Sequence, residues 1–386
     1  MNIAVLNTKF EQVYILDSYE SLIWTDRYYG YGDFEIYLPF KASYLENLRQ
    51  DYYLRIADSE HVMIIEGIKV QTHSETGDHL IITGRSLESL LERRIIWPAY
   101  TVVGNLQDII KDLLTECLID PKNSGSRAFG DKTYIKRKVD NFKFIKNEED
   151  YIKGLKLVDP VDFIGDNLYE VILKWCQDYE IGFKITLEDI NIDGTDYYNQ
   201  FVFRLYEGTD RSFAQTENLW VIFSRDFDNI ISTDYIDDTS TWRNFSVVAG
   251  EEGASPSYLM YGDIEKEGNV YITTGINHRE LYVDARDLQN EELEGATYKE
   301  ALAMRGAEGL NENSKTIEFT GEVEAKREFI YSRDFFMGDI IQITNEYGIE
   351  GKARVVEYIH NDTDAGTEAY PTFEAIQDYQ YSYDES

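Results

Sequence analysis

A phrase near the N-terminus recurs in the second half of the chain, and this internal repeat constrains the fold more than any other feature. Residues 23–26 (IWTD) lead through a Tyr/Gly turn into residues 34–38. Residues 231–234 (ISTD) lead through a Ser/Thr turn into residues 245–248, which places Phe34 and Phe245 at matching positions. Taken alone, this match is no stronger than the shared composition of β-strands.

A second match follows in the same order along the chain. Residues 62–84 are echoed by residues 351–373, with His73 and His360 each just ahead of a polar turn. Two matches in one order predict a duplicated β-unit. Duplicated units commonly serve symmetric assembly, so the repeat also points to an oligomer.

Composition supports a chain of several β-rich domains. A length of 386 residues exceeds one ordinary core, so two to four domains are expected. The 30 Tyr and 19 Phe favour strands, because flat amphipathic rings pack well on a pleated, half-buried surface. With only six Pro and no Gly/Ser-rich run, flexible linkers are not expected.

The predicted fold class is α+β and mainly β, with two related antiparallel β-barrel domains and inserted α/β domains. Closure into a barrel removes exposed strand edges. In chain order, the predicted domains are a first barrel (1–98), an inserted α/β domain (99–213), a second and discontinuous barrel (214–250 and 316–376), an insertion with one helix (251–315), and an acidic tail (377–386).

Three helices within these domains carry start signals. Asn105 is the predicted N-cap of a helix over residues 106–117. Asp166 is the predicted N-cap of a helix over residues 168–179. Thr297 and Glu300 form a capping box for a helix that ends near Leu310.

The formal net charge of −35 limits the partners of the chain. Such an acidic surface repels nucleic-acid phosphates and anionic lipids, so DNA-binding and membrane-surface roles are not expected. Either the surface is acidic for solubility alone, or it includes an inner wall past which DNA slides without sticking. The N-terminus lacks a signal peptide and no apolar run nears the ~20 residues of a membrane span, so we expect a soluble protein made in a cytoplasm.

Sequence signatures of catalysis are lacking. The five histidines show no HxxxH or HExxH spacing, and the chain has no GxSxG motif or Gly-rich phosphate loop. Cys117 and Cys176 lie in apolar helical contexts and are interpreted as buried small hydrophobes. We therefore predict no catalytic, cofactor-binding or metal-binding residues and no enzymatic activity, although acidic residues are too numerous for a glycosidase pair to be ruled out.

Two loops superficially resemble calcium sites. Residues 189–194 (DINIDG) match the first half of a calcium loop, but Gln200 stands where a bidentate Glu belongs. A polar hairpin turn with Gly at positive φ is the favoured interpretation. The same holds for residues 361–366.

Candidate interface residues come from two patterns. Arg placed between carboxylates suggests ion pairs, which are either inter-subunit contacts or intrachain and solvated pairs of little energetic weight. Tryptophans near strands are either interface anchors or core residues, and Trp220 also belongs to this group. The predicted interface set is Trp24, Arg27, Trp97, Arg225, Asp226, Asp284, Arg286 and Asp287.

Several phrases resemble a family of siphophage tail-tip hub proteins, often called tail-associated or Tal-like proteins. These phrases are residues 19–29 together with 32–35, residues 91–98, residues 221–229 and residues 281–288. The family is similar in fold to the baseplate hub of contractile phages. The resemblance implies two related barrels, the second interrupted, and a trimer whose six barrels form a pseudo-hexameric ring that meets the sixfold tail tube.

What the resemblance implies about function is a structural role in the virion. The implied location is the distal tail tip, where the ring closes the tail tube and opens for DNA passage. Implied partners are two further copies of the chain, the distal tail protein, the C-terminus of the tape-measure protein and receptor-binding proteins, with no cofactor and no membrane insertion. Longer relatives carry cell-wall-degrading extensions. Because this sequence ends at Ser386, soon after the second unit, no such activity is expected.

Three other functions remain open at the level of sequence. One is a tail lysin, a peptidoglycan hydrolase or endopeptidase. Another is the hub of a contractile injection apparatus. The third is a carbohydrate-binding adhesin that uses aromatic residues such as Tyr28–Tyr31, for which core or turn packing is the alternative.

Overall fold

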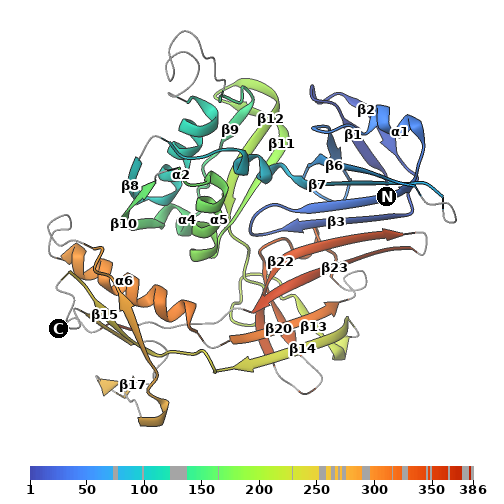
Figure 1. Ribbon diagram of the computed structural model, residues 1–386. Coiled ribbons are helices and arrows are strands. Elements are labelled where there is room, and N and C mark those ends of the chain that lie inside the picture. Colours follow the sequence, from blue (N-terminus) through green and yellow to red (C-terminus); the bar gives the residue numbers. More distant parts are fainter. Residues whose placement is uncertain are drawn as a thin grey trace, which may run out of the picture. The chain divides into compact units, whose positions relative to one another are not determined.

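The computed structural model divides into two compact units and is mainly β, which confirms the predicted fold class (Figure 1). Unit 1 comprises Met1–Leu157, Val161–Ser232 and Gly321–Glu374, and unit 2 comprises Val158–Pro160, Thr233–Thr320 and Ala375–Ser386. The structure describes residues 1–72, 77–97, 100–121, 137–163, 165–227, 229–251, 258–261, 266–267, 270–271, 275–288, 296–314, 316–323, 329–344, 347, 350–363, 366–375 and 382–383. No helix in these ranges is long and apolar enough to cross a membrane.

One large sheet of eleven strands organises unit 1. Its N-terminal strands are β1 (Ile3–Leu6), β2 (Gln12–Leu16), β3 (Ser21–Arg27), β4 (Asp33–Pro39), β5 (Tyr53–Arg55), β6 (Met63–Gln71) and β7 (His79–Ser86). Its later strands are β13 (Ile222–Ser224), β21 (Ile340–Thr344), β22 (Glu350–Thr363) and β23 (Gly366–Ala375). The strand order is β13-β21-β22-β3-β4-β7-β6-β5-β1-β2, with β23 paired to β22.

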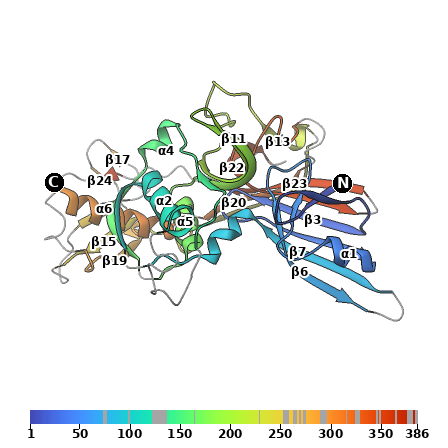
Figure 2. The same ribbon diagram turned by 90° about the horizontal axis from the view of Figure 1, so that it is seen from above.

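Alternating side chains explain why these segments form strands. In β4, Phe34, Ile36 and Leu38 are buried while Asp33 and Glu35 are exposed, which is the period-two pattern of a half-buried strand. The buried residues join a core with neighbouring strands and with α1 (Ala42–Asn47). β6 and β7 lie side by side in both views (Figures 1 and 2).

The first and last parts of the chain meet within this sheet. β3 and β22 pair in antiparallel fashion, with Trp24 opposite His360. Strands of both predicted barrel domains therefore belong to one continuous sheet. Closure of either set into a barrel stays a prediction.

The two segments of the second match each form a hairpin, whereas those of the first match pair differently. Residues 62–84 lie in β6–β7 and residues 351–373 lie in β22–β23; His73 lies outside the described residues, and the duplication itself stays a prediction. By contrast, β3 pairs with β4, whereas β14 (Ile230–Asp238) pairs with β20 (Thr316–Val323) and β15 (Phe245–Ala249) lies in another sheet. The predicted equivalence of Phe34 and Phe245 is thus wrong: Phe245 begins a central strand of unit 2, flanked on both edges.

A helical layer packs on a second sheet within unit 1. α2 (Leu106–Leu114) is capped by Asn105 as predicted, and the chain continues as a π-helical turn, η2 (Thr115–Ile119). α5 (Leu168–Asp178) is capped by Asn167, whose side chain accepts hydrogen bonds from the backbone N–H groups of Tyr169 and Glu170; the predicted cap, Asp166, lies one position too early. The sheet contains β11 (Gly182–Ile192), β12 (Thr195–Tyr206) and β9 (Phe142–Phe144).

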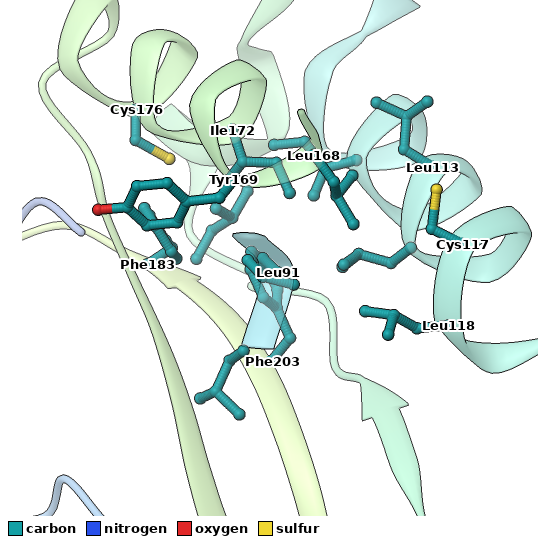
Figure 3. Close-up of a cluster of buried hydrophobic side chains, with 14 of the residues drawn as sticks. Leu91, Leu113, Cys117, Leu118, Leu168, Tyr169, Ile172, Cys176, Phe183 and Phe203 are labelled. Atoms are coloured by element: carbon teal, nitrogen blue, oxygen red, sulfur yellow. The ribbon is translucent and has the colours of Figure 1, made fainter. Parts of the chain in front are cut away.

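The core under these helices is apolar and holds both cysteines (Figure 3). Phe183 of β11 and Phe203 of β12 stack with their ring centroids 5.8 Å apart. Leu91 of η1 (Leu87–Arg93), which directly follows β7, also enters this core, so the first β domain and the α/β layer share buried residues. Cys117 and Cys176 are buried free thiols, which confirms their prediction.

Unit 2 contains a four-stranded sheet covered by one helix. The sheet has the order β19 (Glu280–Asp284), β15, β16 (Tyr258–Tyr261) and β24 (Ser382–Tyr383). α6 (Ala296–Glu312) confirms the predicted helix, and its Leu302 packs with Val248. A Cβ on Gly309 would lie 2.8 Å from Val283 Cγ2, so this glycine lets the helix approach β19 closely.

The remaining elements are short or lie outside the two main sheets. They are β8 (Tyr100–Asn105), α4 (Asp150–Gly154), β10 (Lys156–Phe163), η3 (Arg225–Phe227), β17 (Lys266–Glu267), β18 (Val270–Tyr271) and η4 (Gly275–Asn277). Of the predicted acidic tail, only Ser382–Tyr383 is described.

Candidate functional site

Four ionisable side chains are buried together in unit 1. Asp26 comes from β3, His61 from the loop before β6, Glu88 from η1 and His360 from β22, and each is at most 2% exposed. His61 Nδ1 lies 3.4 Å from Glu88 Oε1, and His360 Nε2 lies 3.9 Å from Asp26 Oδ2. We call these four residues the buried ionic cluster.

The surroundings of Asp26 keep its carboxylate charged. Trp24 Nε1 and Ser59 Oγ donate hydrogen bonds to Asp26 Oδ1 at 3.0 and 2.9 Å. Burial by itself would raise the pKa of Asp26, but the nearby His61 and the hydrogen-bonding partners lower it below its ordinary value. Asp26 is therefore a buried carboxylate anion, stabilised by hydrogen bonds from Trp24 and Ser59 and by the nearby His61.

His61 is the cationic counterpart. Burial would lower its pKa, but Glu88 and Asp26 raise it to about 9, so the imidazole is protonated at neutral pH. Glu88 in turn accepts a hydrogen bond from the backbone N–H of Ile185 in β11 at 2.6 Å and another from Ser86 Oγ. The cluster thus links η1 and the first β domain to the α/β layer.

A second ionic junction joins β22 to the α/β layer. Arg354 Nη2 lies 2.8 Å from Glu180 Oε2, and the guanidinium sits 5.4 Å from the centroid of the Tyr28 ring. The Tyr28 hydroxyl donates a hydrogen bond to the backbone carbonyl of Glu180 at 3.1 Å. Gly338 at φ +88° packs against this ring, where an added Cβ would lie 2.3 Å from Tyr28 Cε2.

Both junctions hold segments of the chain together. The charged atoms of the buried ionic cluster face each other in the core, whereas the Glu180 side chain of the second junction is 59% exposed. The described residues contain no group of three or more His, Cys, Asp or Glu placed to hold a metal ion. Sequence reasoning missed the ionic cluster because its members lie far apart in the chain; the one signal is Asp26, a charged residue inside an otherwise strand-like stretch.

Of the predicted interface residues, Trp24 has to be corrected. Its side chain is fully buried beside Phe34, with ring centroids 5.9 Å apart, so it is a core residue that another subunit cannot reach. Arg27 binds Asp33 and Glu357 at 2.7 and 2.6 Å and so joins β3 to β22 within the chain.

The other predicted residues are spread over both units. In unit 1, Trp97 is partly buried, and the Arg137 guanidinium lies 4.8 Å from the centroid of the Trp97 ring. Arg225 and Asp226 are exposed in η3. In unit 2, Arg286 Nε donates to Asp284 Oδ1 at 2.8 Å, and Asp287 pairs with Arg305 at 2.7 Å. These intrachain pairs match the alternative that the sequence left open, and an inter-subunit role stays a prediction.

The calcium-like segment is a hairpin turn, as predicted. It joins β11 to β12, and Gly194 has φ +80°. Asn191 Oδ1 accepts a hydrogen bond from Gly194 N at 3.1 Å, and Asp189 Oδ1 accepts one from Asn199 N at 2.7 Å. Both side chains thus stabilise the turn itself.

Comparison with solved structures shows that this is the fold of phage tail proteins. The 43 kDa tail protein of prophage MuSo2 from Shewanella oneidensis aligns with a TM-score of 0.56 and 11% identity over 97% of this chain and 98% of that one. A tail protein from Neisseria meningitidis MC58 aligns with a TM-score of 0.55 and 13% identity, covering 98% and 96% of the two chains. Prophage tail protein gp18 from Listeria monocytogenes EGD-e aligns with a TM-score of 0.54 and 13% identity, covering 98% of this chain and 95% of that one.

The sequence then places the chain within a family. Residues 2–373 match the sequence model of the Siphovirus ReqiPepy6 Gp37-like proteins, and the chain belongs to this family. A comparison with curated proteins found no match. The resemblance to siphophage tail proteins drawn from the sequence is thereby confirmed.

Proposed function

We propose that this chain is the structural hub at the distal tip of a long non-contractile phage tail. Three copies form a pseudo-hexameric ring that closes the tail tube before infection and opens to let DNA pass. Its partners are the distal tail protein, the C-terminus of the tape-measure protein and receptor-binding proteins. The siphovirus family favours this assignment over a contractile apparatus.

The pairing of β3 with β22 carries the proposal. It sets two hairpins, β6–β7 and β22–β23, in one sheet of one compact unit. A chain that presents two related β-units offers a trimer six related faces, which suits contact with a sixfold tube. One ionic junction stabilises this arrangement by tying β22 to β3 near the N-terminus, and the other ties β22 to the α/β layer.

An acidic inner wall is part of the proposal. DNA must move past the ring without being retained, and a net charge of −35 per chain opposes phosphate binding. A trimer structure with a neutral or basic inner surface would contradict this point.

Location in the virion is the direct test. Antibody against the purified chain, visualised with gold on intact virions, is expected to label the tail end distal to the capsid. Labelling of the capsid, or absence of the chain from purified virions by mass spectrometry, would refute the hub assignment.

The alternative of a tail lysin is tested separately. The proposal expects no cleared band when the purified chain is run in a gel containing host cell walls. A cleared band lost on mutation of a carboxylate would instead establish a hydrolase.

A further inference from the structure

A short loop before β13 presents large apolar side chains to solvent. Leu219 is 85% exposed and Trp220 is 49% exposed, although both belong to the most buried kinds of side chain. Phe213 packs edge-on against Trp220, with ring centroids 5.2 Å apart. Phe336 is also exposed and lies 5.9 Å from the guanidinium of Arg211, which neighbours this loop. We call Phe213, Leu219, Trp220 and Phe336 the β13 surface.

The loop is held rigidly in this shape. Asn218 N donates to Gln215 Oε1 at 2.6 Å, and Gln215 Nε2 donates to the backbone carbonyl of Ser212 at 3.1 Å. Trp220 Nε1 donates to the backbone carbonyl of Gln215 at 3.0 Å, so the indole keeps a fixed orientation. A surface ordered in advance loses little entropy on binding, which is the property of an interface anchor.

Strand addition is blocked at β13 itself. The Asn229 side chain accepts a hydrogen bond from Ser224 N at 2.8 Å and donates one to the backbone carbonyl of Ile222 at 2.9 Å. This amide satisfies the backbone of β13, which is a known way of protecting a sheet edge. Whatever binds here must therefore pack on side chains.

The other end of the same strand order also carries exposed apolar residues. β2 is the last strand, paired among the described residues only with β1. Val13 is 43% exposed and Ile15 is 49% exposed. We call Val13 and Ile15 the β2 surface. Both surfaces belong to unit 1, so they are distinct patches on one compact body.

Charge favours a second copy as the occupant. Of residues 212–224, only Glu217 is charged, and residues 12–16 contain no charge, in a chain that is 28% charged overall. Arg211 lies beside Phe336 and is neutralised by Asp339 at 2.6 Å. A basic partner would be met by carboxylates at its contact. A second copy, itself at −35, is repelled least where charge is lacking, because like charges across an interface cost free energy.

We propose that the β13 surface of one copy packs on the β2 surface of the next, head to tail. Two different surfaces make a heterologous contact, which closes into a ring when the rotation permits. This inference rests on the ring of the proposed function and names the two surfaces that join its subunits.

Molecular mass in solution tests the contact. We expect the purified chain to sediment at about three times 44.9 kDa. Leu219→Asp and Ile15→Asp each place a charge at one surface and are expected to weaken association by about thirtyfold or more. Tyr198→Asp, at an exposed site on β12, is the matched control and should keep the mass of the parent. Equal far-ultraviolet circular dichroism and melting temperatures would show that all three variants fold.

Mixing the variants tests whether the contact is head to tail. Leu219→Asp keeps its β2 surface and Ile15→Asp keeps its β13 surface, so an equimolar mixture can form one intact contact and should yield a one-to-one dimer. Persistence of the parental mass in either folded variant would overturn the inference, as would a monomeric parent chain or a mixture that stays monomeric. If any of these outcomes were found while gold labelling still placed the chain at the tail tip, the proposed hub function would stand and only the pairing of these two surfaces would be rejected.

Discussion

His360 of β22 lies directly opposite Trp24 of β3, although the two residues come from opposite ends of the chain. Beneath this pair, Asp26 receives a hydrogen bond from the Trp24 indole and faces the imidazole of His360. The fold of unit 1 therefore depends on a C-terminal strand reaching an N-terminal one.

Removal of the buried cation should destabilise unit 1 strongly. His61→Gln leaves Glu88 and Asp26 without their shared partner, and breaking a buried ion pair typically costs about 3–5 kcal/mol. The measurement is the free energy of unfolding in urea. His79→Gln is the control, because His79 pairs with the more exposed Glu20 at 3.6 Å and should change stability by less than about 1 kcal/mol. Equal effects of the two substitutions would contradict the cluster.

Stability should fall as pH rises above neutrality. The folded-state pKa of His61 is raised from 6.5 to about 9, so its contribution is complete below pH 6.5 and is lost as pH approaches 9. Asp26 acts in the opposite sense, since its lowered pKa gives stability that is lost only in acid. Urea midpoints from pH 6 to 9.5 should decline in the parent chain and decline less in His61→Gln. Parallel profiles would count against protonated His61.

Gly338 should tolerate no side chain. A φ of +88° is strained for any residue other than Gly, and an added Cβ would lie 2.3 Å from the Tyr28 ring. Gly338→Ala should therefore lower the free energy of unfolding by more than backbone strain alone would. Gly194 is the matched control, with φ +80° and open space where a Cβ would lie, so Gly194→Ala should cost only about 1–2 kcal/mol of backbone strain. Thermal melting of both variants would separate packing from backbone effects. Similar melting temperatures would show that Tyr28 moves aside.

Neither cysteine should react in the folded protein. Burial raises the pKa of both the Cys117 and Cys176 thiols, and only thiolates react readily. Titration with a thiol-specific chromogenic reagent should detect no fast-reacting group in the native chain and two in guanidinium chloride. A fast native thiol would place one cysteine at the surface.

Local structure follows closely from the sequence in this chain. The helices predicted to begin after Asn105 and near Asp166 are found as α2 and α5, because helical hydrogen bonds join residues only a few positions apart. Asn105 is predicted correctly as a helix cap for the same reason: its Oδ1 accepts the capping hydrogen bond from the backbone N–H of Asp108, three residues along the chain. The polar turn at Gly194 is likewise a local feature.

Only the tertiary structure decides which distant segments meet. Backbone hydrogen-bonding groups are the same in every strand, so the sequence cannot tell that β3 takes β22 as its partner or that β15 joins β19 in unit 2. The sequence also left open whether a tryptophan in or near a strand is core or surface: Trp24 in β3 is buried, and Trp220 before β13 is exposed. The ionic cluster and the β13 surface arise from packing between segments remote in sequence, because burial is a property of the folded chain and not of any one residue.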